Sequence, residues 1–250
     1  MKSIPLGLQL YSVRDDCARD LPATLAAVAK MGYAGVEFAG YYQHSARELR
    51  GMLDGLGLKC CGTHIGLNTL LGDELSATVE FNLELGNPFL VVPWIGEERR
   101  NSTAAWQATA ALFTEIAAKL RPHNLHLGYH NHHMEFEALE GSTGFDIFYT
   151  SAGADVFMQL DLGNAMVGGA DALDYLRRFN RRAVTIHLKE YSAGNPDAVI
   201  GEGEVDWTAV FRLCEGGGVT QWYIVEQESH AVSPLDSAER CRVFLKGMGR

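Results

Sequence analysis

Gln159-Leu-Asp-Leu-Gly-Asn164 is followed, after one helix-length interval, by Ile186-His-Leu-Lys-Glu190. Each stretch is a short apolar run that ends in side chains able to bind a metal ion or to move a proton. A third stretch, Trp222-Tyr-Ile-Val-Glu-Gln-Glu228, has the same form. In a parallel barrel, the polar groups at the carboxyl ends of the strands meet at one face and build the active site. We therefore expect the acidic and imidazole groups of these three stretches to converge.

The metal-ligand candidates in these stretches are Asp161, His187 and Glu226, at corresponding points of three successive strand-like segments. Neighbouring strands lie about 4.8 Å apart, so equivalent positions on them can share one ion. Carboxylate and imidazole ligands suit Mn²⁺, which we expect first, and also Mg²⁺, Co²⁺ or Zn²⁺. Such an ion polarises a substrate oxygen while a neighbouring group moves a proton. A helix cap for Asp161 and a surface charge for Glu226 are ordinary alternatives when each residue is considered alone.

Outward from this region, apolar strand-like runs alternate with helical segments along the whole chain. Strands are predicted at 6–13, 35–39, 59–64, 89–94, 125–130, 156–162, 183–189 and 222–226. Helices are predicted at 21–31, 45–56, 74–85, 103–120, 143–152, 170–179, 207–214 and 234–248, with Ser45 and Glu48 spaced as a capping box. Most of the strands are apolar throughout, which is typical of a parallel sheet buried on both faces. Eight strands and eight helices predict an α/β fold, a (β/α)₈ TIM barrel forming a single domain over residues 1–250.

The composition limits the classes of partner and the cellular location. The chain of 250 residues has a formal net charge of −10, and nucleic-acid binding depends mainly on clustered Lys and Arg. We therefore expect a small-molecule partner and no nucleic acid, with homo-oligomer formation left open. The start of the chain lacks a signal-peptide pattern and no apolar stretch is long enough to span a membrane, so we expect a cytoplasmic protein without a membrane partner. The cysteines are odd in number and lack CxxC spacing, which favours buried thiols: Cys17, Cys60, Cys61, Cys214 and Cys241.

The fifth predicted strand ends in the run Tyr129-His-Asn-His-His-Met-Glu135. Because side chains alternate along a strand, His130 and His132 share one face and are the better candidates for the barrel interior. Lys189 shares a face with His187, which makes it the best-placed cation for a substrate oxygen. The catalytic candidates are His130, His132, Lys189 and Glu226.

Other polar and aromatic side chains follow the remaining strands. We expect an aromatic face to pack on the C–H surface of a sugar while polar groups bind its hydroxyls. The expected substrate-binding residues are Tyr11, His64, Trp94 and Asn164. Gln9 and Glu37 are also polar groups near strand ends, and Arg14 could assist a carboxylate or phosphate of the substrate, although a solvated surface position suits it equally well.

These residues carry a resemblance to a known family. The motifs are Gln9-Leu-Tyr-Ser-Val-Arg14, Tyr129-His-Asn-His132 with Glu135, Leu160-Asp-Leu-Gly-Asn-Ala165, His187-Leu-Lys-Glu190, Gly201-Glu-Gly-Glu-Val-Asp-Trp207 and Val225-Glu226. Over essentially its full length the chain resembles the sugar phosphate isomerase/epimerase family with a xylose-isomerase-like barrel, which includes ketose epimerases and inosose dehydratases. The resemblance implies a divalent-metal-dependent sugar isomerase or epimerase that acts on a small sugar or keto-polyol through a metal-stabilised enediolate. It also implies four ligands from strands five to eight, of which Asp161, His187 and Glu226 match directly.

The chain departs from the family pattern at strand five. Ketose 3-epimerases have a metal-binding, proton-exchanging glutamate three residues before an Asn, and alignment on Asn131 places Gly128 there. We expect Glu135 to supply the fourth metal ligand, with His130 or His132 as the next choices. Loss of the glutamate favours elimination by a keto-sugar or inosose dehydratase, or isomerisation, over C3 epimerisation. An abasic-site endonuclease and a non-catalytic sugar-binding barrel are less favoured alternatives.

With Gly128 at that position, proton transfer is expected to fall to His130, to His132 or to Lys189. A histidine base with an ordinary pKa of about 6.5 predicts an activity that rises through neutral pH.

Overall fold

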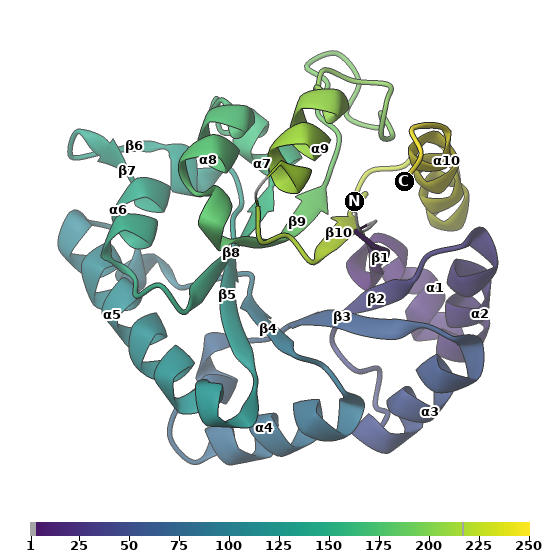
Figure 1. Cartoon of the computed structure of the whole chain (residues 1–250), viewed down its shortest axis with the longest axis horizontal. Helices are drawn as coiled ribbons and strands as arrows, with labels where there is room; N and C mark the ends of the chain where they lie inside the picture. Colours follow the sequence, from purple (N-terminus) through teal and green to yellow (C-terminus); the bar gives the residue numbers. More distant parts are fainter. Residues whose placement is uncertain (1–3, 217) are drawn as a thin grey trace.

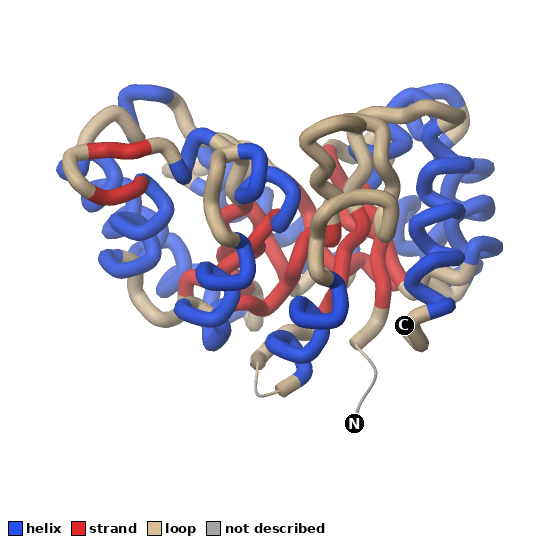
Figure 2. Tube along the Cα trace, turned by 90° about the horizontal axis from the view of Figure 1, so that it is seen from above, coloured by secondary structure: helices blue, strands red, loops and turns tan. Residues whose placement is uncertain are grey.

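The computed structural model describes residues 4–216 and 218–250, so residues 1–3 and 217 of the predicted domain lie outside the described part. Eight parallel strands close into a barrel in the order β1-β10-β9-β8-β5-β4-β3-β2. The strands are β1 (Leu6–Gln9), β2 (Gly35–Ala39), β3 (Lys59–His64), β4 (Phe89–Val92), β5 (His126–His130), β8 (Val156–Asp161), β9 (Ala183–Leu188) and β10 (Trp222–Val225). Helices form an outer ring around these strands (Figures 1 and 2). The predicted single-domain TIM barrel is confirmed.

A helix follows each barrel strand, as predicted. These helices are α2 (Leu21–Met31), α3 (Ala46–Leu56), α4 (Glu74–Leu85), α5 (Thr103–Leu120), α6 (Gly144–Ser151), α8 (Ala172–Arg178), α9 (Trp207–Glu215) and α10 (Pro234–Gly247). The predicted capping box is present, because the Ser45 hydroxyl accepts from the Glu48 amide while the Glu48 carboxylate accepts from the Ser45 amide. All five cysteines are buried and unpaired. No helix of the described residues is long and apolar enough to cross a membrane.

The chain also contains short elements that the pattern of strands and helices did not predict. They are α1 (Arg14–Arg19), α7 (Leu162–Val167), the hairpin β6 (Ala138–Leu139) with β7 (Ser142–Thr143), and the 3₁₀ turns η1 (Leu10–Val13), η2 (Leu67–Leu70), η3 (Glu97–Arg99), η4 (Arg121–His123), η5 (Met134–Phe136) and η6 (Asn180–Arg182). Most of the short α-helices and 3₁₀ turns lie at strand or helix ends. They therefore set where the polar residues that follow the strands are placed.

The first strand is shorter than the predicted 6–13, and that prediction was wrong beyond Gln9. The Gln9 Oε1 accepts a hydrogen bond of 3.0 Å from the Tyr11 backbone N–H, and this bond turns the chain into η1. Several other strands also end one or two residues earlier than predicted. As a result Lys189 and Glu226 lie just beyond β9 and β10.

The part of the barrel interior next to the amino ends of the strands, called the lower part below, is apolar. Phe89, Val91 and Phe157 form a buried cluster there, against which Val184 and Trp222 pack. Gly128 adjoins this cluster. A Cβ atom at Gly128 would lie 2.4 Å from the Phe157 ring, so the ring leaves no room for a larger residue on β5 at this point.

Candidate metal centre and its pocket

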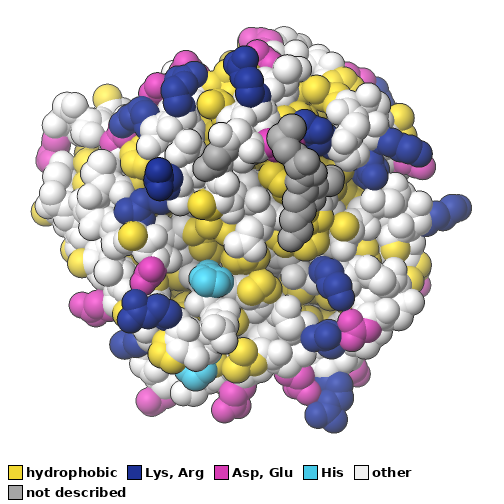
Figure 3. Space-filling model, viewed as in Figure 1, with side chains coloured by type: hydrophobic (Ala, Val, Ile, Leu, Met, Phe, Trp, Pro, Cys, Tyr) yellow, Lys and Arg dark blue, Asp and Glu magenta, His cyan; other side chains and the backbone are white. Residues whose placement is uncertain are grey.

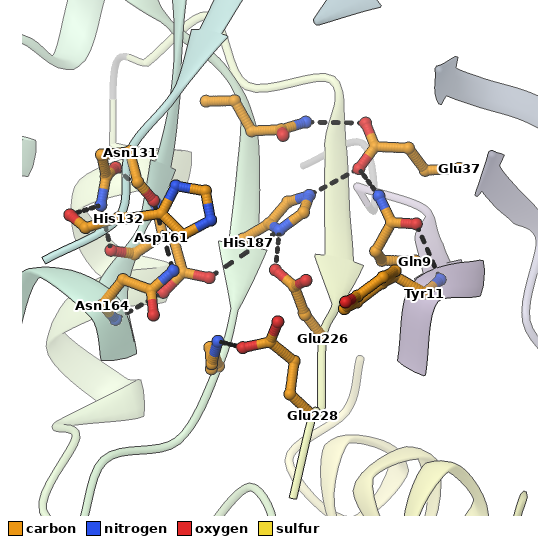
Figure 4. Close-up of polar contacts among 12 residues, drawn as sticks. Gln9, Tyr11, Glu37, Asn131, His132, Asp161, Asn164, His187, Glu226 and Glu228 are labelled. Atoms are coloured by element: carbon orange, nitrogen blue, oxygen red, sulfur yellow. Dashed lines mark hydrogen bonds and ion pairs between the residues drawn. The ribbon is translucent and has the colours of Figure 1, made fainter. Parts of the chain in front are cut away.

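Four buried side chains converge at the carboxyl ends of neighbouring strands. His130 ends β5, Asp161 ends β8, His187 lies on β9 and Glu226 follows β10. Each offers a ligand atom, and these four atoms all lie within 4.8 Å of one another. His187 Nδ1 lies 2.7 Å from Glu226 Oε2 and 3.9 Å from Asp161 Oδ2 (Figure 4). The three residues expected from the sequence thus meet, together with His130; these four residues are called the metal-site cluster below.

Two atoms of the metal-site cluster are buried without a hydrogen-bond partner, namely Asp161 Oδ2 and His130 Nδ1. Asp161 Oδ1 is occupied, because it accepts a 2.6 Å hydrogen bond from the Asn164 amide and so caps α7. An unsatisfied buried acceptor costs about 1–3 kcal/mol, which a cation would offset. The two uses considered for Asp161 are therefore compatible: one oxygen caps the helix and the other faces the cluster. The donor set fits a divalent ion.

The charges of the cluster support the same conclusion. Burial raises the pKa of Asp161 to about 7, although Lys189 opposes the rise and Glu226 adds to it. Burial also opposes ionisation of Glu226, but His187 and Lys189 outweigh it and hold the pKa of that carboxyl well below its usual value. Burial alone would lower the pKa of His187, but the carboxylates of Glu37 and Glu226 outweigh burial and raise this pKa to about 10. These carboxylates therefore favour a positive charge between them, which a divalent ion would supply in place of the protons.

The carboxylate of Glu135 does not join the cluster, and our expectation of a ligand from this residue does not agree with the geometry. Its Oε1 accepts a 2.6 Å bond from the Tyr129 hydroxyl and its Oε2 a 2.8 Å bond from the His132 amide. Glu135 lies in η5, and both of its carboxylate oxygens are bonded to residues outside the cluster. His130, one of the next choices, is the fourth member of the group of side chains that lie close enough to hold one ion.

Strand parity correctly separates the two faces of β5. His130 points inward, while Tyr129 packs outward against Phe113 and Phe148. Asn131 was not among the expected site residues. Its side chain binds both backbone polar groups of Asp161, accepting from the amide at 2.9 Å and donating to the carbonyl at 3.1 Å. Asn131 therefore ties the ends of β5 and β8 together beside the cluster.

Glu37 is a second residue whose importance was missed. It is fully buried on β2, across the barrel from β8 and β9, and its carboxylate contacts Gln9 and His187 (Figure 4). It also contacts Gln159. Burial opposes its ionisation, but His64 and His187 outweigh this effect and lower the pKa of Glu37 to about 2. The available signal was a carboxylate inside the otherwise apolar strand 35–39, which normally requires buried partners.

A pocket of about 650 Å³ opens above the cluster. Its lining residues are Tyr11, Ala39, His64, Ile65, Gly66, Leu67, Asn68, Leu71, Pro93, Trp94, Ile95, Gly96, Arg99, His130, His132, Glu226 and Glu228. Tyr11 and Trp94, 43% and 52% exposed, lie in this wall as large accessible aromatic side chains. The expected substrate-binding residues Tyr11, His64 and Trp94 thus face one space, together with the catalytic candidate His132.

Among the residues expected to bind substrate or to move protons, two do not line this pocket, namely Asn164 and Lys189. The Asn164 side-chain amide donates a hydrogen bond of 3.3 Å to the Asn131 carbonyl, and the Asn164 backbone N–H donates to Asp161. Asn164 thus bonds to the residues around the cluster. Lys189 forms an ion pair with Glu228, which does line the pocket. Burial lowers the pKa of Lys189, but Asp161, Glu226 and Glu228 raise it above its usual value. These carboxylates therefore favour the ammonium form of Lys189 over the neutral amine that a base requires.

Burial affects the pKa of both inward histidines of the β5 region, His130 and His132. Burial lowers the pKa of His130 well below its usual value, and burial also lowers the pKa of His132. The ring centroids of His130 and His132 lie 5.1 Å apart. The His132 and Trp94 rings pack in a T-shaped arrangement with a centroid distance of 5.6 Å. His132 is thus a neutral imidazole at neutral pH. This corrects the expectation that a histidine base here has an ordinary pKa.

The fold and this centre agree with a family model described as a xylose isomerase-like TIM barrel, which matches residues 25–246. The chain belongs to this family. Inosose dehydratase from Serratia proteamaculans is 23% identical to the chain, and the match covers 89% of the chain and 88% of that protein. Sugar isomerases and epimerases as well as inosose dehydratases are therefore represented among the proteins that the chain resembles.

Solved structures show the same fold. A sugar phosphate isomerase/epimerase from Parabacteroides distasonis superposes with a TM-score of 0.84 at 20% identity, covering 98% of this chain and 94% of that one. A structure of L-ribulose 3-epimerase superposes with a TM-score of 0.71 at 15% identity, covering 99% of this chain and 94% of that one. At these identities the likeness establishes the barrel fold alone.

Proposed function

We propose that this protein is a divalent-metal-dependent enzyme that removes the proton next to the carbonyl of a small keto-sugar or keto-polyol, and that elimination of water is the favoured outcome. The observation that carries the proposal is the metal-site cluster at the base of the pocket, in which His130 is the fourth member, while Gly128 stands where ketose 3-epimerases have a glutamate. The likeness to inosose dehydratases supports elimination, since their name describes loss of water from a keto-cyclitol.

His130, Asp161, His187 and Glu226 would hold the ion, with Mn²⁺ the first expectation. A bound divalent ion supplies Lewis acidity, which draws electron density from the carbonyl and acidifies the adjacent C–H bond. Because Glu226 is engaged with His187 and has a lowered pKa, it is a weak base and serves as a ligand. The proton must therefore move to another group that lines the pocket.

His132 is the proposed base. It lines the pocket, its ring is neutral, and its backbone amide is held by Glu135. In the proposed sequence, His132 accepts the α-proton while the C–H electron pair forms the new C=C bond. The β-hydroxyl departs with the C–O electrons and takes the proton from the imidazolium, so one group serves as base and then as acid. Keto-sugar is thereby converted to an unsaturated ketone and water.

The pocket favours an uncharged substrate. Arg99 is the one Lys or Arg side chain among the lining residues of the described chain, whereas Glu226 and Glu228 contribute carboxylates. A phosphorylated sugar would meet little compensating positive charge there. The aromatic rings of Tyr11 and Trp94 offer apolar faces for sugar C–H groups. We therefore propose an unphosphorylated ketose, inosose or other keto-polyol.

A nucleic-acid substrate is disfavoured by the net charge of −10. On the face seen in Figure 3, acidic and basic side chains lie interspersed, without a continuous basic patch of the kind that a phosphate backbone requires.

The test is an assay of the chelator-treated protein before and after addition of Mn²⁺. Free ketohexoses, inososes, 3-keto-glycosides and dehydroshikimate are offered in D₂O, with ultraviolet detection of unsaturated ketones and NMR detection of solvent exchange. We expect Mn²⁺-dependent formation of an unsaturated product to exceed C3 epimerisation. Rapid 3-epimerisation of free ketohexoses that persists in His132→Gln would contradict the proposal.

A further inference from the structure

The carboxylate of Glu37 is surrounded by nitrogen atoms deep in the barrel. Gln9 Nε2 donates to its Oε2 at 2.8 Å and Gln159 Nε2 donates to its Oε1 at 2.8 Å. His187 Nε2 lies 2.6 Å from Oε2, and His64 Nε2 lies 3.2 Å from the same oxygen. An ionised carboxylate can only accept hydrogen bonds. The close contact with His187 therefore requires a proton on His187 Nε2. The contact of Nδ1 with Glu226 Oε2 at 2.7 Å likewise requires a proton on Nδ1, which a bound ion would replace.

That proton determines which ring nitrogen of His187 is free. In a neutral imidazole, protonation of Nε2 leaves the lone pair on Nδ1. Nδ1 is the atom that faces Asp161 and Glu226, at 3.9 and 2.7 Å from their nearest oxygens. The contact with Glu37 thus directs the lone pair of His187 into the metal-site cluster.

The strands around Glu37 are shaped to admit it. The pairing of β2 with β3 shifts register between Val36 and Glu37, and such bulges redirect a side chain. Glu37 then pairs with Gly62, where a Cβ atom would lie 2.3 Å from the Glu37 Oε1. A side chain at position 62 would occupy the space that the carboxylate uses. The local backbone therefore accommodates the Glu37 carboxylate, although Glu37 is not among the residues that line the pocket.

We propose that Glu37 is a positioning residue of the metal centre: it holds His187 as the Nε2–H tautomer and fixes its ring so that Nδ1 binds the ion. Gln9 and Gln159 in turn hold Glu37. Gln9 is itself anchored to the Tyr11 amide at 3.0 Å, and Gln159 donates to the Thr185 hydroxyl at 3.0 Å. This inference rests on the metal centre of the proposed function.

The first experiment uses the unaltered protein loaded with Zn²⁺, which is diamagnetic. Long-range ¹H–¹⁵N spectra of ¹⁵N-histidine protein, assigned with a His187→Gln sample, report which ring nitrogen carries the proton. We expect His187 to be protonated at Nε2 and to bind the ion through Nδ1. A proton on Nδ1, or ligation through Nε2, overturns the inference.

The second experiment measures Mn²⁺ affinity of Glu37→Gln by titration calorimetry. The amide of a glutamine at position 37 would turn one donor toward the donors of Gln9, Gln159 or His187, so the ring loses its fixed partner. Loss of such an outer partner of a metal ligand weakens binding about 10- to 100-fold, and we expect a loss in this range. The matched control is Glu190→Gln, which alters another buried carboxylate.

Glu190 is suited to this control because its carboxylate bonds to the segment that follows it, accepting from the Gly201 amide at 2.7 Å and from the Trp207 indole at 2.9 Å. We expect Mn²⁺ affinity within twofold of the parent in Glu190→Gln. Parent-like affinity in Glu37→Gln overturns this inference while leaving the proposed function intact. Absence of binding in the parent protein overturns both. Should Glu37→Gln fail to fold, the tautomer measured in the parent decides.

Discussion

The lower and upper parts of the barrel interior are built on different principles. The lower part is the apolar cluster of Phe89, Val91 and Phe157, where fit depends on ring packing. The part above it is polar, and there Glu37 and Gln159 are fully buried yet hydrogen-bonded. Added atoms destabilise the packing of the lower part, whereas in the polar layer each donor or acceptor that lacks a partner is costly.

Strand β8 passes through both parts. Its alternate residues Phe157, Gln159 and Asp161 are an aromatic ring of the apolar cluster, a hydrogen-bonding amide and a member of the metal-site cluster. Along three inward-facing positions of one strand, the interior side chains thus change from packing residues that stabilise the fold to polar residues suited to bind a metal ion. Substitutions at the two ends should accordingly have separable effects, and the following changes test that separation.

The largest effect is expected for Asp161→Asn. The new side-chain amide keeps an oxygen that can cap α7 by accepting from the Asn164 backbone N–H. The substitution nevertheless removes the negative charge of the ligand. We expect Mn²⁺ affinity to fall by more than about 100-fold, beyond the loss for an outer partner, and activity to vanish. The protein should remain folded with a melting temperature close to that of the parent. Elemental analysis after dialysis measures retained metal, and a full equivalent in the folded variant would defeat the assignment.

The next effect concerns His132 and pH. Because burial lowers the pKa of His132, the neutral base is present above a value that lies below 6.5. Activity should therefore stay level from neutral pH down past 6.5 and fall only on further acidification. His132→Gln should lower kcat by about 10²- to 10⁴-fold, as for a lost general base, with Mn²⁺ affinity retained. A kcat profile that instead rises through neutral pH would assign the proton transfer to another group.

A change in the lower part should affect stability alone. Gly128→Ala places a Cβ 2.4 Å from the Phe157 ring, and overpacking of this kind costs about 1–3 kcal/mol. We expect the urea midpoint to fall accordingly while Mn²⁺ affinity stays at the parent value. The double variant Gly128→Ala with Phe157→Leu should recover part of the loss. Loss of metal affinity in the single variant would show that the two parts are coupled.

The fold could be predicted from the sequence because each unit repeats the same local signal, an apolar run followed by an amphipathic helix. The convergence of Asp161, His187 and Glu226 followed from strand parity and from the order of neighbouring strands in a barrel. Inward placement of His130 followed from parity as well. These inferences need only periodicity and topology, which a sequence carries directly.

The remaining features depend on contacts across the barrel or on turns. Glu37 meets His187 from a strand 150 residues earlier, and parity places both inside without showing that they touch. The side chain of Glu135 was expected to reach the ion, but η5 turns it toward Tyr129. The pairing of Lys189 with Glu228 joins two loops. Such contacts are fixed by backbone geometry beyond the strand ends, for which no periodic signal exists.

The smallest effect is expected at the pocket wall, with Trp94→Ala. Trp94 is 52% exposed, and its ring contacts His132 at the pocket edge. Its indole would pack against substrate in both the ground state and the transition state, and uniform binding of this kind affects KM without changing kcat. We expect a few-fold rise in KM, unchanged kcat and unchanged Mn²⁺ affinity once the substrate is identified from the panel. A fall in kcat with constant KM would instead show that Trp94 orients His132 for proton transfer, which would extend the catalytic region from the barrel interior to its rim.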